Sequence, residues 1–288
     1  MRNKSSNNTN TLSVVKKVLG HALIYIQLVI VAIIVIYPVL WVTGTAFNPI
    51  NSISRASIIP AGATLDNFRH LFAETRYIRW YRNTLYMATL TMILSVLLNT
   101  STAFVFARFR FRGRNAGLIT VMVLQAFPSF MGLIALYMLA LNFNMLDNHN
   151  MLVLIYVAGS IPTGIWLVRG NMLNLPKSLD EAAYIDGATK LQVFIRIILP
   201  LSMPIICFIG LTAFMAPWMD FMLPRFLISR ADNLNIGVGL FDMINDHRVQ
   251  FTTFAAGALL VAIPVTILFI IGQKFMITGI AAGANKGE

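Results

Sequence analysis

The chain has 288 residues, of which 57% are hydrophobic and only 11% are charged, and its mean hydropathy is +0.73. Soluble domains carry about 25% charged residues, so this composition excludes an ordinary water-soluble protein and indicates a membrane protein. The net charge of +11 would also suit nucleic acid, and RFRFRGR at 108–114 interleaves aromatic residues with arginines. Because that cluster directly follows an apolar segment, we interpret it as a collar facing anionic lipid headgroups, and we expect no nucleic-acid partner.

Six long segments lack Asp, Glu, Lys and Arg, and each reaches the about 20 residues that a helix needs to cross a bilayer. Runs such as LIYIQLVIVAIIVIYPVLW at 23–41 do not alternate as barrel strands do. The first segment is also too long for a cleaved signal peptide, so we expect it to be retained. We therefore predict an all-α membrane protein with six transmembrane helices, at 19–46, 83–107, 115–141, 150–170, 201–223 and 252–274. These helices form one membrane domain over 19–277, between a polar N-terminus at 1–18, whose first ten residues are expected to be disordered, and a tail at 278–288.

Lysine and arginine in the connecting segments predict the orientation. With the N-terminus in the cytoplasm, the inner segments carry 14 basic and 4 acidic residues, a net charge of +10. The outer segments then carry 8 basic and 7 acidic residues, a net charge of +1. Both termini are therefore expected in the cytoplasm, although the arginine-rich first outer loop fits the rule imperfectly.

Catalytic and metal-binding motifs do not appear in the sequence. There is no GxxxxGK followed by Ser or Thr, so the chain is not expected to bind ATP itself. The four histidines, at 21, 70, 149 and 247, show no metal-ligand spacing, and the single cysteine, Cys207, excludes an intrachain disulfide. The predicted spans hold almost no ionisable residues, which argues against proton coupling. We expect a protein that is not an enzyme and has no cofactor or metal.

A compact polar segment at 176–200, here called the elbow, separates the fourth and fifth predicted helices. Ser178 with Glu181, and Thr189 with Gln192, have the spacing of capping boxes, which predicts two short helices. Gly187 between them suits the left-handed residue that ends a helix. The acids at 180, 181 and 186 and the small residues at 182, 183, 187 and 188 predict a projecting knob that another protein approaches closely.

The elbow also matches a known motif, EAA, three residues, G, nine residues, I, one residue, LP. This resembles the EAA motif of the membrane subunits of binding-protein-dependent ABC importers. The resemblance implies a MetI-like fold in the plasma or inner membrane, with an elbow that seats in a cytoplasmic ATPase subunit. It implies as partners a second permease, two ATPase copies that bind the ATP, and an outer solute-binding protein. The residues assigned to coupling are Glu181, Ala182, Ala183, Asp186, Gly187, Ala188, Ile197, Leu199 and Pro200.

Three further strings resemble the carbohydrate branch of these importers, especially the smaller permease of maltose and maltodextrin systems. They are EAAYIDGATKLQVF at 181–194 with ILPLSMP at 198–204, APWMDF at 216–221 and QKFMITGIAAGANKG at 273–287. The resemblance implies a sugar substrate, and a flexible tail that reaches between the ATPase subunits. No path residue is assigned, although aromatic and amide side chains suited to sugars occur at Trp166, Trp218, Tyr137, Asn99 and Gln125. Three alternatives stay open: the same machine for another small solute, an ion-driven secondary transporter, and a scaffold.

Overall fold

The computed structural model describes residues 5–50, 57–126, 132–245 and 251–284, and every regular element in these ranges is helical. Contacts between residues divide the chain into two units, each described by itself below. The first unit comprises 1–70 with 250–259, and the second comprises 71–249 with 260–288. The predicted all-α class is confirmed.

Four helices are long and apolar enough to cross a membrane within the described ranges. The spanning parts are Leu19–Ala46 of α1, Tyr77–Arg108 (α3), His149–Leu173 (α6) and Phe251–Phe275 of α13. A fifth span is formed if Lys190–Leu201 and Met203–Met219, bent by 79° at Ser202, count as one. The predicted number of six stays a prediction.

The first unit is organised around the buried side chain of Asn67, in α2 (Asp66–Glu74). Its amide nitrogen donates to the carbonyls of Ala46 and Asn48, each at 2.9 Å, where α1 (Ser5–Ala46) ends. Its amide oxygen accepts from the Thr252 hydroxyl at 2.9 Å, in the first turn of α13 (Phe251–Ala284). The last carbonyls of a helix have no hydrogen-bond partner within the helix, and here the Asn67 amide supplies a donor to the carbonyl at the end of α1.

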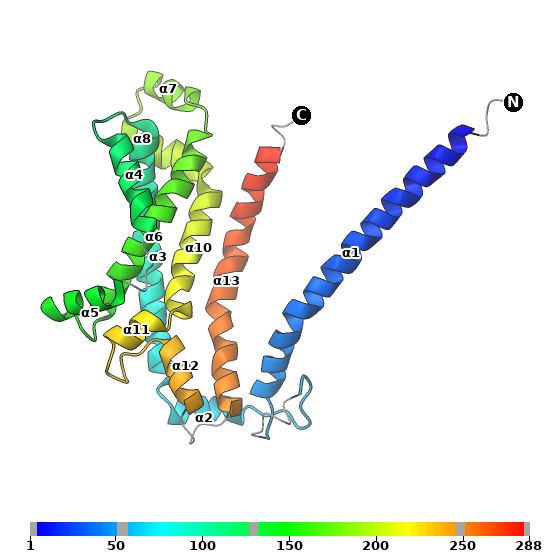
Figure 1. The fold of residues 1–288 in the computed structure, drawn as a ribbon, viewed down its shortest axis with the longest axis vertical. Coiled ribbons are helices and arrows are strands. Elements are labelled where there is room, and N and C mark those ends of the chain that lie inside the picture. The colour runs from blue at the N-terminus through cyan, green and yellow to red at the C-terminus, as the bar shows by residue number, and fades with distance from the viewer. Residues whose placement is uncertain (1–4, 51–56, 127–131, 246–250, 285–288) are drawn as a thin grey trace. The chain divides into compact units, whose positions relative to one another are not determined.

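In the second unit, α3 and α6 pack along most of their lengths, and α10 (Met203–Met219) packs against both (Figure 1). Small residues bring the helices together. Gly164 of α6 lies so close to the Asn99 side chain of α3 that a Cβ at position 164 would collide with it. Asn99 is fully buried and donates to Ser160 at 3.2 Å, and Ser160 donates to Ser95 at 2.9 Å. Interhelical hydrogen bonds between small polar side chains are typical of membrane bundles.

Shorter helices complete the second unit, and in Figure 1 those of the elbow lie at the opposite end of α3 from α12. They are α4 (Arg114–Gln125), α5 (Leu133–Asn142), α7 (Ser178–Ile185), α8 (Lys190–Val193), a π-helical turn η3 (Phe194–Ile198), α9 (Leu199–Leu201), α11 (Met222–Leu227) and α12 (Ile236–Asn245). Asn235 caps α12 by accepting from Val238 N at 3.0 Å, while its nitrogen donates to the Asp220 carbonyl at 2.7 Å.

The structure differs from the sequence prediction in three helices. The segment at 115–141 is not one helix, because α4 ends at Gln125 and α5 begins at Leu133. Pro128 falls in the interruption, and residues 127–131 lie outside the described ranges. The N-terminus, predicted to be disordered, is helical from Ser5. The tail, predicted to be a flexible strand, continues α13 to Ala284. Extending an existing helix avoids the cost of nucleation, so polar and glycine-containing ends can stay helical.

Candidate functional site

The elbow forms two short helices joined by a tight turn. α7 ends at Ile185, and Gly187 adopts the left-handed conformation with φ of +80°. Its N–H donates to the Tyr184 carbonyl at 3.1 Å, and the next N–H, of Ala188, donates to the Ala183 carbonyl at 2.9 Å. A Cβ at Gly187 would meet nothing within 4 Å, so glycine is needed here for its backbone conformation and not for space.

One of the two predicted capping boxes is present. The Thr189 hydroxyl accepts from Gln192 N at 3.3 Å, and the Gln192 side chain accepts from Thr189 N at 2.7 Å. The predicted box at Ser178 is wrong: α7 begins at Ser178 itself, its N-cap position is Lys177, and no side chain caps it. Asp180 and Glu181 still place two carboxylates in the first turn, where the helix dipole favours negative charge.

Beyond the turn, the chain enters the bundle through an irregular helix. α8 passes into the π-helical turn η3 and then into α9, which ends one residue beyond Pro200. The buried Ser202 follows, and there the axis bends by 79° into α10. Pro200 and Pro204 flank the bend, and neither has an N–H to continue an α-helical ladder.

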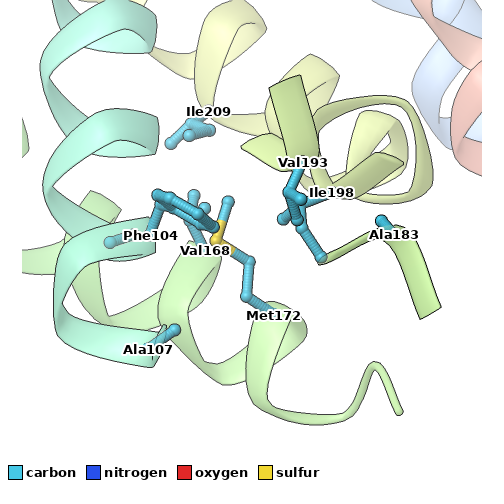
Figure 2. Packing of buried hydrophobic residues seen from close by; sticks show 9 residues of the cluster. Phe104, Ala107, Val168, Met172, Ala183, Val193, Ile198 and Ile209 are labelled. Atoms are coloured by element: carbon cyan, nitrogen blue, oxygen red, sulfur yellow. The ribbon is translucent and has the colours of Figure 1, made fainter. Parts of the chain in front are cut away.

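Apolar side chains anchor the elbow to the bundle. Ala183, Val193 and Ile198 from the elbow are buried together with residues from the ends of α3 and α6 and from the first half of α10 (Figure 2). The partners from the three long helices are Ala103, Phe104, Ala107, Val168, Met172 and Ile209. Phe104 and Phe194 add a ring contact with centroids 4.7 Å apart. The cluster joins the elbow to all three core helices, so these parts are packed as one body.

A buried ion pair adds a second link between the elbow and α3. Arg108 Nε lies 2.7 Å from Asp180 Oδ2, and their side chains are only 5% and 9% exposed. Arg108 Nη2 also donates to the Leu175 carbonyl at 3.2 Å, just before α7. Burial raises the pKa of the Asp180 carboxyl above its usual value, and the Arg108 charge acts in the opposite direction. Such a pair is costly to break from one side, because the remaining charge stays buried.

The surface of the elbow is both acidic and apolar. Glu181 and Asp186 are exposed, as predicted for a negative knob, whereas Asp180 faces the bundle. Ile185 is 87% exposed at the end of α7, and Leu191 is 65% exposed on α8. The elbow therefore exposes both aliphatic and carboxylate side chains close to its turn.

The residues predicted for coupling therefore separate into two groups. Glu181, Ala182, Asp186, Gly187 and Pro200 are exposed, whereas Ala183 is buried and Ala188, Ile197 and Leu199 are partly buried. The burial of Ala183 means that its small size serves packing within this chain. Prediction missed Arg108, which the alternating pattern of arginines had assigned to a lipid-facing collar. It also missed Ile185, whose exposure depends on how α7 is oriented.

A cavity of about 820 Å³ lies between α5, α6, α10 and α11. Its polar lining includes Tyr156, Ser160, Thr163, Thr212 and Asp220, and the Tyr156 hydroxyl donates to Asp220 at 2.9 Å. None of the five sugar-suited residues that the sequence offers lines this cavity. Two of them form hydrogen bonds to residues that do line it: Gln125 donates to Thr163 at 2.6 Å, and Asn99 donates to Ser160. Trp218 is 5% exposed and packs edge-on against Tyr81.

Comparison with known proteins agrees with the motif in the elbow. Residues 100–276 match the family described as "Binding-protein-dependent transport system inner membrane component". The galactooligosaccharides transport system permease protein GanQ of Bacillus subtilis (strain 168) is 42% identical over 267 residues, 91% of this chain and 94% of that protein. The maltodextrin permease MdxG of the same strain is 40% identical over 264 residues, 91% and 95% of the two chains. The maltose/maltodextrin permease MalG of Vibrio parahaemolyticus is 31% identical over 273 residues, 88% and 92%.

Among solved structures, the chain resembles one chain of a bacterial ABC transporter involved in the import of the acidic polysaccharide alginate. The TM-score is 0.78 with 19% sequence identity, over 90% of this chain and 97% of that chain. This likeness extends to nearly the whole length of both chains and concerns the fold.

Proposed function

Because this chain belongs to the binding-protein-dependent transport system inner membrane components, we propose that it forms half of the translocation path of an ABC importer for oligosaccharides. It is a multi-pass membrane protein, and the path is completed by a second permease. An outer binding protein delivers the sugar, and two cytoplasmic ATPase subunits supply the energy. The chain itself binds no cofactor, because the ATP sites lie on the ATPase subunits.

The observation that carries the coupling role is the contrast between the two faces of the elbow. Its inner face is fixed to three core helices by the apolar cluster and the Arg108–Asp180 pair. Its outer face presents Ile185, Glu181 and Asp186. A docked ATPase that moves this face therefore moves the ends of α3, α6 and α10 with it, as a rigid body.

The substrate class is proposed from the relatives and supported by the cavity. The named relatives carry galactooligosaccharides, maltodextrin and maltose. The cavity between α5, α6, α10 and α11 presents hydroxyl groups and one carboxylate on otherwise apolar walls. Such groups exchange hydrogen bonds with sugar hydroxyls, and the apolar walls accept the C–H faces of pyranose rings. We propose that this cavity is this chain's part of the sugar path.

Co-purification tests the assembly. The affinity-tagged chain is solubilised in mild detergent from its native cells, and the associated chains are identified by mass spectrometry. Recovery of an ATPase and a second permease supports the proposal, and a stable lone chain overturns it. Uptake assays then identify the substrate. Labelled maltodextrins and labelled galactooligosaccharides are each offered in competition with the other sugar and with unrelated solutes. Uptake that survives ATP depletion and stops when the ion gradient is dissipated would instead establish a secondary transporter.

Site-directed crosslinking tests the elbow. In a Cys207→Ser background, Ile185→Cys is expected to crosslink to the ATPase through a short bifunctional reagent. Phe143→Cys is the matched control, because Phe143 is 68% exposed at the end of α5, outside the elbow. Equal crosslinking from both positions, or none from Ile185→Cys in an intact complex, would contradict the proposed docking face.

A further inference from the structure

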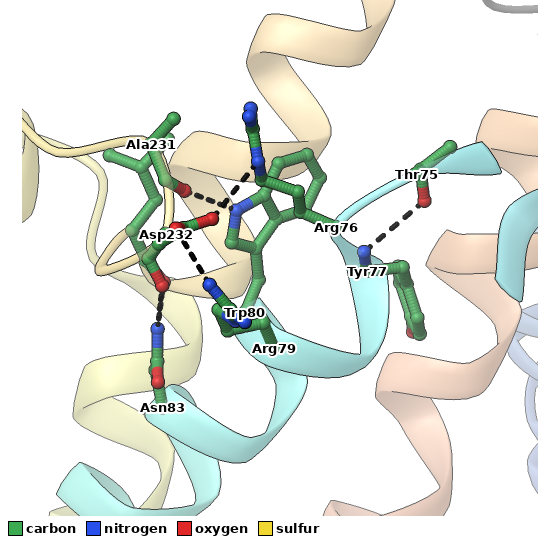
Figure 3. Close-up of polar contacts among 9 residues, drawn as sticks. Thr75, Arg76, Tyr77, Arg79, Trp80, Asn83, Ala231 and Asp232 are labelled. Carbon is green, nitrogen blue, oxygen red and sulfur yellow. Dashed lines mark hydrogen bonds and ion pairs between the residues drawn. The ribbon is translucent and has the colours of Figure 1, made fainter. Parts of the chain in front are cut away.

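Three arginines, one at the N-cap position and two in the first two turns of α3, lie at the end of that helix remote from the elbow. Arg76, Arg79 and Arg82 are spaced three residues apart, so their side chains project from neighbouring turns. Arg76 and Arg79 lie 3.0 and 2.6 Å from the two carboxylate oxygens of Asp232 (Figure 3). Arg82 is exposed and makes no ion pair within the part of the chain that the structure describes. One aspartate thus offsets only one of three positive charges.

These arginines line a groove of about 940 Å³ with a firmly held opposite wall. Trp80 Nε1 donates to the Ala231 carbonyl at 2.8 Å, and Asn83 Nδ2 donates to the Asp232 carbonyl at 2.8 Å (Figure 3). His149 Nε2 lies 2.7 Å from the Asn233 carbonyl on the same wall. Because the backbone at 231–233 is fixed in this way, the groove is formed before any ligand enters. Its charged lining has a net charge of +2, so an anion is the ligand that it favours.

An apolar groove of about 440 Å³ adjoins the basic one. The two share Arg82 and Tyr86, and the second continues along α3 past Leu85, Leu90 and Ile93. Leu85 and Ile93 are 38% and 52% exposed, so an apolar ligand can lie against them. The Tyr86 hydroxyl donates to the Asn150 side chain at 2.7 Å, which leaves its ring at the junction of the two grooves.

Distance along α3 places the junction at the level of lipid headgroups. Arg82 and Arg108 are 26 residues apart in one helix, or about 39 Å at 1.5 Å per residue. A bilayer with its headgroup layers is about 40–45 Å thick. With Arg108 beside the elbow at one surface, Arg82 reaches the headgroups of the opposite leaflet. Tyrosine beside arginine is common at this depth.

We propose that this double groove binds an anionic phospholipid, with the phosphate on Arg82 and Arg79 and one acyl chain along Leu85, Leu90 and Ile93. A soluble binding protein would engage the basic groove alone, and a helix of the second permease would engage the apolar groove alone. Only a lipid matches both chemistries in this order. The proposal depends on the chain spanning a bilayer and not on the identity of the transported sugar.

Native mass spectrometry of the detergent-purified complex tests the site, with phosphatidylglycerol titrated against phosphatidylcholine of the same acyl chains. Arg82→Gln is expected to weaken phosphatidylglycerol binding about fivefold, the effect of one basic residue at a lipid surface. Asp232→Asn is expected to strengthen it, because the lining gains a net positive charge. Arg69→Gln is the matched control: Arg69 is an exposed arginine of α2, paired with Asp66.

Five results would overturn the proposal. The first is phosphatidylglycerol binding that is unchanged in Arg82→Gln, and the second is equal binding of phosphatidylcholine. The third is full displacement of the lipid by inorganic phosphate or glycerol phosphate, which would make the site one for a free anion. The fourth is an Arg82→Gln variant that retains the lipid but loses stimulation of the ATPase by the binding protein, which would reassign the groove to protein docking. The fifth is an intact complex that transports sugar but binds no lipid, which would reject this site and leave the proposed function standing.

Discussion

The buried Arg108–Asp180 pair gives the sharpest test of how the elbow is attached. Replacing Asp180 with Asn keeps the shape of the side chain but removes its negative charge, so the buried Arg108 charge faces only neutral acceptors there, the new amide oxygen and the Leu175 carbonyl, among the residues that the structure describes. Removing one member of a buried pair costs about 3–5 kcal/mol, because the uncompensated charge is far from water. Arginine cannot relieve this by losing its proton. The Asp180→Asn variant should therefore be strongly destabilised at this contact.

The cost should appear as local detachment of the elbow and not as unfolding of the bundle. α7 is held to the rest of the chain mainly by this pair and by Ala183, whereas α3, α6 and α10 also pack against one another. Local opening therefore requires only the fewer contacts of α7 to break, while those among α3, α6 and α10 persist. A loss of about 3 kcal/mol corresponds to amide exchange about 100-fold faster over 178–185, or to the rate of an unstructured segment. Exchange in α3 and α6 should stay unchanged.

Hydrogen–deuterium exchange of the purified protein measures this directly, and two further variants make it decisive. Glu181→Gln removes the neighbouring, exposed carboxylate, so exchange over 178–185 should stay as in the parent protein while stimulation of the ATPase falls. The double variant Arg108→Met with Asp180→Leu replaces the pair by apolar side chains and should restore protection, since such replacements are often neutral or stabilising. Unchanged exchange in Asp180→Asn, or a double variant no better than the single one, would show that the ion pair does not hold α7 to the bundle.

Three further changes test the same region and the core. In Arg108→Met, Asp180 stays buried without its partner, and burial raises the pKa of its carboxyl. A carboxyl whose pKa is raised on folding stabilises the folded state at pH values below its unfolded pKa of about 4. That stability is lost as the pH rises through the folded pKa. The protection factor of the elbow amides, which compares the measured exchange rate with the intrinsic rate at the same pH, should be larger at pH 5 than at pH 8 in this variant; equal protection factors at the two pH values would contradict the argument. Gly187→Ala should cost about 1–2 kcal/mol and lower uptake, because alanine is strained at positive φ, and Gly187→Asn should recover most of both; equal losses would contradict a conformational cause. Gly164→Ala should lower thermal stability by about 1–3 kcal/mol through collision with Asn99, whereas Gly170→Ala on the same helix meets nothing within 4 Å; similar melting temperatures for the two would contradict this packing.

Local features of the elbow could be predicted from the sequence because they depend on neighbouring residues. The turn at Gly187 and the capping box of Thr189 with Gln192 each involve groups three to five residues apart. The same reasoning failed at Ser178, because the spacing of a capping box does not fix where a helix starts. There the pair between Asp180 and Arg108 fixes the acidic first turn of α7 against α3, and α7 begins one residue earlier than a Ser178 cap would require.

Contacts between distant residues could not be predicted in this way. Arg108 and Asp180 are 72 positions apart, and nothing in the string RFRFRGR distinguishes Arg108 from the three arginines that follow it. The sugar-suited residues illustrate the same limit. Asn99 was considered for its amide, but its position on the buried face between α3 and α6 depends on Gly164 opposite it, 65 positions away. Which face of an apolar helix looks inward is determined by the neighbouring helix, and uniformly apolar spans carry little periodicity to indicate it.

The two ends of α3 suggest how movement of the elbow reaches the other side of the membrane. At one end Arg108 is paired with α7, and at the other the Trp80 ring is packed so closely on Gly239 of α12 that a Cβ there would collide with it. The Thr84 hydroxyl also accepts from Ile236 N at 2.7 Å, at the start of α12. α3 is a continuous helix of 32 residues without an internal proline, so it bends less readily than α6 or α13. A shift of α7 should therefore be transmitted along α3 to α12, which places the segment after α10 under the control of the ATPase. Gly239→Ala, which separates Trp80 from α12, should then reduce uptake per ATP hydrolysed while leaving the ATPase bound; an unchanged ratio would show that α3 is not the connecting element.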